Sequence, residues 1–211
     1  MNVRLGPPKS DTSDKRSIYP VDRDLLNRFC THFRDNKENN PSTSNFYLYP
    51  PELDEVIFDI NENALKVLFP LFNAWLHGLG ALRTLNGNPA RILGLLTLCR
   101  LYVFGDLLGA PLFSDAVIDE IKQKRQVFDA CEFSAIKDAI MYVYGLPYMA
   151  LRAAVLDFIV VNSGPWVIVA FDWPSIARKD MLDTLFAGCK SSIECRASDD
   201  APRYLAEVDE W

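Results

Sequence analysis

The sequence predicts an α+β protein in which a small β-sheet flanks a larger cluster of helices. Three observations lead to this class. Alternating apolar and polar residues, which are typical of strands, occur only within the first 60 residues. A densely apolar segment, Leu93 to Ile121, indicates two consecutive helices that belong inside the fold. Beyond residue 125 the pattern is helical throughout, so helices should predominate.

The composition is that of an ordinary globular protein. At 49% hydrophobic and 24% charged residues, a chain of 211 residues can bury a real core as one domain or as one domain plus a helical annex. The formal net charge of -6, without a clustered excess of Lys and Arg, argues against nucleic acid as a partner. Residues 1–15 lack the apolar core of a signal peptide, so we expect a cytoplasmic or nuclear protein. The five cysteines are odd in number and scattered, which favours free thiols.

The N-terminal residues predict a loose β-hairpin followed by a short helix. Asn2–Leu5 and Ser17–Val21 alternate in polarity, and turn-forming residues separate them. Asp22 is a suitable N-cap for a helix that ends at Phe29, and a second short turn follows at Thr31–Arg34. The apolar side of the helix should consist of Leu25, Leu26 and Phe29.

A third strand and a longer helix are expected next. Residues 35–44 are polar and aperiodic, which predicts a surface loop, and Glu55–Ile60 alternates as a strand does. The helix that follows has one apolar face, made of Leu65, Leu68, Phe69, Phe72, Trp75 and Leu76. Pro70 lies within this pattern and removes a backbone hydrogen bond, at a cost of about 3 kcal/mol, which predicts a kink or a late helix start. Gly78 then opens a loop.

The densest apolar segment predicts a buried helical hairpin. From Ile92 to Leu108 the chain is apolar nearly all round, yet this run is shorter than the roughly 20 residues of a bilayer crossing, so we expect a buried central helix. Three of its residues that should be buried are Leu96, Cys99 and Val103. Gly109 suits a left-handed helix cap, and Pro111 suits the first turn of a second helix. That helix should bury Phe113, Val117 and Ile121 and expose Asp115, Asp119 and Lys122.

The remaining residues predict further helices and a tail. Helical periodicity covers residues 133–144, 148–161 and 174–187, and an apolar run centred on tryptophan covers residues 166–171. From Cys189 the residues become polar and acidic, which predicts a poorly ordered tail.

Several of these segments resemble BTB/POZ domains, especially those of filamentous fungi. Leu101–Ile121 (LYVFGDLLGAPLFSDAVIDEI) resembles the family's leucine-tyrosine-centred helix with the short break and helix that follow it. Ile18–Asn36 is similar to the signature of valine-histidine, a leucine pair and serine-proline-phenylalanine-phenylalanine. The matching residues are Val21, Leu25, Leu26 and Phe33, and the departures are Asp22, Cys30, Thr31 and His32. Phe72–Gly78 (FNAWLHG) resembles the family's tryptophan-leucine-tyrosine-threonine-glycine helix end, with His77 in the tyrosine's place.

The resemblance extends to the C-terminal helices. A valine-tyrosine pair, Val143 and Tyr144, precedes a helix with a leucine-arginine pair, Leu151 and Arg152, as in the helical extension of fungal BTB proteins. The implied fold is a BTB/POZ-like helical cluster flanked by a small β-sheet, with an all-helical C-terminal extension. The implied organisation is a BTB/POZ-like domain over residues 1–125, a helical extension over residues 126–190 and an acidic, flexible tail over residues 191–211.

The residues that could carry chemistry are few. A zinc site would have to be assembled from Cys30 and His32 plus distant groups, since neither histidine has a partner at ligand spacing. His77 lies at a predicted helix end, where histidine more often interacts with the last carbonyls than acts as a base. Cys189 and Cys195 are too far apart for a short-spaced metal or redox pair.

No catalytic motif is recognisable in the sequence. It contains no P-loop, dinucleotide fingerprint or nucleophile elbow, and Asp115 and Asp119 are best interpreted as surface charge on a helix. We therefore predict no catalytic, cofactor-binding or metal-binding residues and no cofactor, and assign no partner-binding residues.

The resemblance implies a protein–protein interaction module without catalytic activity. BTB domains act as dimerisation modules and, when paired helices follow, as adaptors that dock on the cullin scaffold of ubiquitin ligases. Asn2–Leu5 should leave a sheet edge, and Pro7 and Pro8 should blunt its pairing, so we expect a weak homodimer or a different protein partner, with no nucleic acid and no membrane. The alternatives are a small intracellular hydrolase or metal-dependent enzyme on an unrecognised fold, and a degenerate BTB paralogue without a surviving partner.

Overall fold

A computed structural model describes most of the secondary structure of the chain. The described residues are 2–5, 18–34, 45–48, 60, 62–78, 82–83, 86, 88, 90, 93–124, 132–163 and 172–200. The chain divides into two compact units, Met1–Val155 and Leu156–Trp211. Helices predominate and a small sheet accompanies them, as the predicted α+β class requires. The predicted division at residues 125 and 126 between a domain and its extension stays a prediction.

Three short strands form one sheet in the order β2-β1-β3. β1 (Asn2–Leu5) pairs antiparallel with β2 (Ile18–Pro20), which confirms the predicted hairpin. β1 also pairs in parallel with β3 (Asn45–Leu48), a strand that the sequence patterns did not indicate. The prediction that Asn2–Leu5 forms a sheet edge is therefore wrong, because β1 is the central strand. Of the strand predicted at Glu55–Ile60, residues 55–59 lie outside the described residues, and Ile60 is buried but not in a strand.

The first two helices agree with the sequence except at Pro70. α1 (Arg23–Phe29) begins after Asp22, whose Oδ1 accepts hydrogen bonds from the backbone N–H groups of Asp24 and Leu25, at 2.8 and 3.2 Å. α4 (Glu62–Gly78) runs through Pro70, so the expected late helix start is wrong, while the kink predicted as its alternative stays a prediction. All six residues of the predicted apolar face of α4 are buried, and this packing offsets the hydrogen bond that proline cannot make.

The buried helical hairpin forms as the sequence predicts. α5 (Leu95–Leu107) starts three residues later than expected, because Gly94 precedes its first turn as the N-cap. Cys99 and Val103 are fully buried, but Leu96 is only half-buried, so its predicted burial is wrong. Gly109 has a φ of +60° in the left-handed region, and α6 (Pro111–Gln123) follows with proline in its first turn. α6 buries and exposes the two predicted sets of residues.

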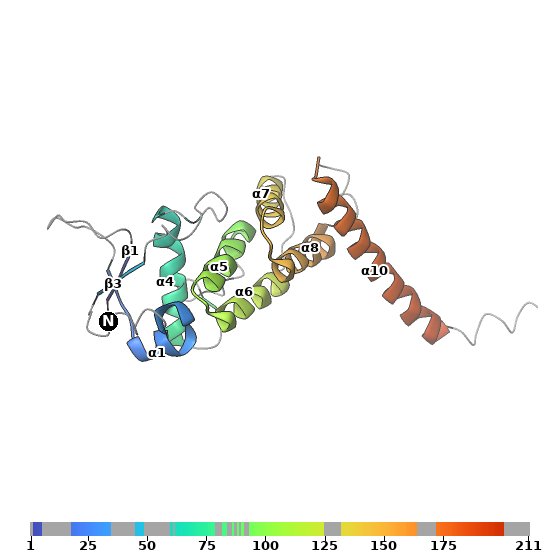
Figure 1. The fold of residues 1–211 in the computed structure, drawn as a ribbon. Coiled ribbons are helices and arrows are strands. Elements are labelled where there is room, and N and C mark those ends of the chain that lie inside the picture. Colours follow the sequence, from blue (N-terminus) through green and yellow to red (C-terminus); the bar gives the residue numbers. More distant parts are fainter. Residues whose placement is uncertain are drawn as a thin grey trace, which may run out of the picture. The chain divides into compact units, whose positions relative to one another are not determined.

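The first unit is layered around α5. Figure 1 shows the strands beside α4, and α4 contacts β1 on one side and α5 on the other. α7 (Glu132–Tyr144) packs against α5, so residues beyond 126 contribute to this unit. α8 (Met149–Ser163) begins in the first unit and ends in the second.

The second unit contains the longest helix. α10 covers Ser175–Asp200, so the chain between Cys189 and Asp200 is helical where the sequence predicts the start of a poorly ordered tail. Local helix formers such as Lys190, Glu194 and Ala197 favour this conformation without requiring an apolar face. Residues 201–211 and the apolar run at residues 166–171 lie outside the described residues. Within the described ranges, none of the helices is both long and apolar enough to cross a bilayer.

Candidate interaction surface

The turn between α5 and α6 is hydrogen-bonded to the helical segment at residues 31–34. The backbone N–H of Thr31 donates to the carbonyl of Gly109 at 3.1 Å, and that of His32 donates to the carbonyl of Leu108 at 3.2 Å. A side-chain Cβ at Gly109 would collide with the hydroxyl of Thr31. Glycine is therefore required at this turn for its conformation and for the close approach of the segment at residues 31–34.

A second glycine allows α5 and α6 to approach each other closely. A Cβ at Gly105 would lie 2.6 Å from Phe113 Cδ1 and 2.7 Å from Ser114 Oγ. The Phe113 ring meets the rings of Phe72 and Trp75 of α4, with centroids 5.1 and 5.2 Å away. These three helices are thus closely packed, and the exposed end of α5 extends from this core.

Two tyrosines and a carboxylate join the end of α5 to the start of α8. The hydroxyl of Tyr148 donates a 2.8 Å hydrogen bond to Asp106 Oδ2. The Tyr148 ring also lies edge-on to the ring of Tyr102, one turn before Asp106, with centroids 5.6 Å apart. Asp106 is exposed and both tyrosines are half-buried, so the cluster is accessible from solvent.

The environment of this cluster favours neutral tyrosines. Burial raises the pKa of Tyr148, and the hydrogen bond and negative charge of Asp106 raise it further. Burial also raises the pKa of Tyr102, with added contributions from the charges of Asp106 and Asp115. Both hydroxyls therefore keep their protons at neutral pH, and that of Tyr148 donates to Asp106.

An arginine extends the surface along α8. The Arg152 guanidinium lies 4.5 Å from the centroid of the Tyr144 ring, a cation–π contact. Its Nη2 donates to the carbonyl of Leu146 at 3.1 Å, and its Nη1 lies 3.8 Å from the sulfur of Met149, a weak acceptor. Its buried Nε has no hydrogen-bond partner, and no carboxylate of the described residues pairs with it. Arg152 is thus a cation held in place by its contacts, and its guanidinium has further N–H groups that can donate hydrogen bonds.

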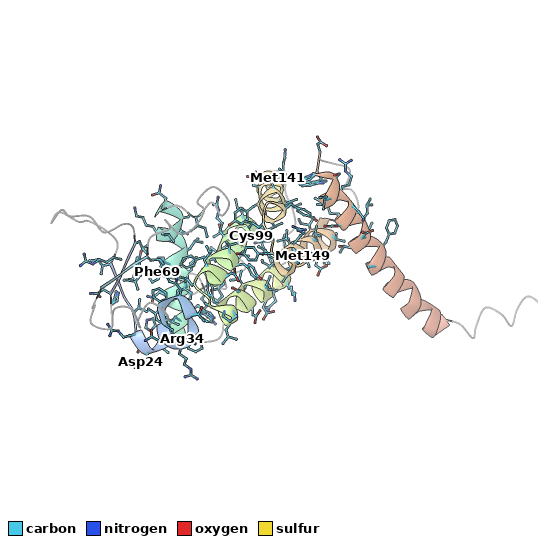
Figure 2. All side chains as sticks on the ribbon, viewed as in Figure 1. Asp24, Arg34, Phe69, Cys99, Met141 and Met149 are labelled. Carbon is cyan, nitrogen blue, oxygen red and sulfur yellow. The ribbon has the colours of Figure 1, made fainter. Side chains whose placement is uncertain are left out.

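An exposed methionine completes this region. Met149, labelled in Figure 2 at the start of α8, is 70% exposed, and its sulfur lies beside Arg152. Tyrosine, methionine and arginine are enriched at protein–protein interfaces. We name the region the α5–α8 surface and define it by the linked residues Tyr102, Asp106, Tyr144, Tyr148, Met149 and Arg152.

The residues considered for zinc do not form a cluster in the described structure. Cys30 is buried, and burial raises the pKa of its thiol to about 12. His32 is half-buried, with its ring edge-on to Phe33. His77 is exposed and lies in the last turn of α4, which confirms its predicted position at a helix end. Among the described residues, no three His, Cys, Asp or Glu side chains could hold a metal ion together.

The remaining predicted residues are spread over the molecule. Asp115 and Asp119 lie on the exposed side of α6, as expected for surface charge. Cys189 and Cys195 lie within α10, and their side chains are outside the described residues. On α1, Leu26 is buried, while Phe29 is half-buried and lies edge-on to Trp75 with centroids 6.0 Å apart.

Sequence patterns alone did not indicate the α5–α8 surface. The BTB resemblance singles out Tyr144 and Arg152, whereas periodicity alone places Tyr148 and Met149 in a helical run. Aromatic, basic and sulfur-containing residues spaced along a helix start were the available signal, but their partners lie 42 residues away for Asp106 and 46 for Tyr102. No family model, curated protein or solved structure matches this chain.

Proposed function

We propose that this chain is a BTB/POZ-like protein–protein interaction module without catalytic activity. The observation that carries the proposal is the α5–α8 surface, which presents methionine, tyrosine and arginine side chains next to one another. Along the chain, a hairpin, a short helix, a long helix and a buried helix pair follow one another, and this order supports the BTB resemblance.

The chemistry of the surface suggests what a partner would offer. Met149 can adapt to an irregular apolar side chain, and Arg152 can pair with a carboxylate. A protein segment with neighbouring apolar and acidic residues would satisfy both. The partner we propose is a protein of this kind, and the resemblance adds a cullin-type scaffold as the first candidate.

The proposal can be tested with a substitution at the most exposed residue of the surface. Met149→Asp introduces a charge where the side chain is 70% exposed, and Val67→Asp is a matched control on α4, where the side chain is 55% exposed. Both variants should fold, since neither residue belongs to the core. In titrations with purified cullin N-terminal domains, Met149→Asp should raise the dissociation constant at least about tenfold, as loss of a central interface residue does, and Val67→Asp should not.

A scaffold other than cullin requires a wider search. Tagged wild-type chain and both variants can be purified from cells, and the bound proteins compared by quantitative mass spectrometry. A partner depleted with Met149→Asp but retained with Val67→Asp supports the proposal. If cullins do not bind and no protein shows this difference, the α5–α8 surface is not an interaction site.

A further inference from the structure

α10 has a second face that its own unit leaves open. Ala177 and Met181 are fully buried, whereas Leu182 is 37% exposed and Phe186 is 59% exposed. At 100° per residue, the exposed pair lies about 140° around the helix from the buried pair. The two sets therefore face different surroundings, and the exposed side carries two large apolar side chains.

The sequence continues this face with the spacing of a coiled-coil seam. Leu182, Phe186, Cys189 and Ile193 follow one another at intervals of four, three and four residues. This is the alternation of d and a positions over two heptads, and α10 is helical over the whole of it. An apolar seam of this kind is buried by another helix with the same spacing.

The charges beside the seam indicate which helix that is. With Leu182 at a d position, Arg178 occupies a g position and Asp183 the following e position, five residues later. In a parallel, in-register pair of helices these two positions face each other across the interface. Arg178 of one helix would then meet Asp183 of an identical helix, and the same contact would form twice. An antiparallel pair would instead place g opposite g and e opposite e, so like charges would face each other.

Arg178 is available for such a contact. Within its own unit it pairs with Asp172 at 3.5 Å, but the Asp172 side chain is fully exposed. Ion pairs at exposed positions contribute little to stability and exchange readily. The charges therefore set the orientation of a helix pair, and the apolar seam supplies its attraction.

We propose that α10 pairs in parallel with α10 of a second copy of this chain, with Leu182 and Phe186 at the centre of the contact. This self-association is independent of the α5–α8 surface and of the function proposed for it. A seam of two heptads is short, so the dimer should be weak: monomer at low micromolar concentration and a rising dimer fraction above it.

Sedimentation velocity of the full chain over a concentration series, under reducing conditions, tests the proposal. Leu182→Glu combined with Phe186→Glu should raise the dimer dissociation constant at least about tenfold. Ile176→Glu is the matched control, because Ile176 is 62% exposed on the same helix but lies before the seam. A wild-type chain that stays monomeric throughout, or a dimer that the double substitution leaves intact, overturns the proposal.

Charge reversal tests the orientation and does not depend on the apolar variants folding. Arg178→Asp and Asp183→Arg should each weaken the dimer by placing like charges together, and the two changes combined should restore it. Both side chains are exposed, so the fold should tolerate the changes, and circular dichroism checks this. Additive weakening in the combined variant would rule out the parallel pairing.

Discussion

The hydroxyl of Tyr148 donates a hydrogen bond to Asp106 across 42 residues of sequence, and this bond ties the start of α8 to the last turns of α5. Tyr148 also accepts, through its carbonyl, the first backbone hydrogen bond of α8, from the N–H of Arg152 at 3.0 Å. The position of Arg152 on the surface thus depends on the same residue that holds Asp106. Stability and partner binding should therefore respond together when this bond is removed.

Tyr148→Phe removes the hydrogen bond and keeps the ring. Because the bond is accessible to solvent, the free energy of unfolding should fall by only about 0.5 to 1 kcal/mol. A double-mutant cycle with Asp106→Asn, measured by urea denaturation, isolates the contribution of the pair. If the two substitutions are additive, the hydrogen bond does not contribute to stability.

The tyrosine pair also predicts a loss of stability at alkaline pH. The pKa values of Tyr148 and Tyr102 are raised in the folded chain, so the folded state holds these protons more tightly than the unfolded state. Their contribution is complete below pH about 10, where tyrosine of the unfolded chain begins to ionise, and is lost as the pH rises further. Urea denaturation should show a steeper loss above this pH for the wild type than for a variant with phenylalanine at both positions. If stability falls equally steeply with pH in both proteins, the pKa values of Tyr102 and Tyr148 are not raised in the folded chain.

α5 allows a direct comparison between a buried leucine and one whose predicted burial is wrong. Leu98 is fully buried and Leu96 only half-buried. Leu98→Ala should lower the free energy of unfolding by about 2 to 5 kcal/mol, because it removes buried methyl groups and leaves a cavity. Leu96→Ala should cost clearly less in the same denaturation experiment. Equal losses would show that both side chains belong to the core.

Features that depend on residues close together in the sequence were predicted correctly. Helical periodicity predicted the buried faces of α4 and α6, and the local chemistry of Asp22, Gly109 and Pro111 predicted where helices begin and end. These features depend on residues within one or two turns of each other. Leu96 was misjudged because α5 is apolar on all sides, so periodicity cannot tell its more exposed side from the others.

Contacts between segments far apart in the sequence could not be predicted from such local patterns. β3 has four residues, and its parallel pairing with β1 joins segments more than 40 residues apart, so nothing local marks it as a strand. The α5–α8 surface is of the same kind, because Tyr102 and Tyr148 are in contact although α6 and α7 lie between them in the sequence.

The cysteines provide a further test. Cys30 and Cys99 are free and buried, and burial raises the pKa of both thiols, so neither should react with a thiol reagent in the folded protein at neutral pH. After unfolding without reductant, all five cysteines should titrate as free thiols. A count of three or of one would show one or two disulfides among the five and contradict the expected reducing environment.

The last prediction concerns the turn that joins α5 to α6. Gly109 has a left-handed backbone conformation, and a Cβ there would also strike the hydroxyl of Thr31. Gly109→Ala should therefore lower the free energy of unfolding by at least about 1 to 2 kcal/mol, the cost of the backbone conformation alone. Thr31→Ala in the same chain should recover part of the loss, since it removes the hydroxyl but not the backbone strain. Gly78→Ala is the control: no atom lies within 4 Å of its added Cβ, so it should leave the protein as stable or slightly more stable. If Gly109→Ala behaves like Gly78→Ala in thermal denaturation, the close contact between this turn and Thr31 does not exist in solution.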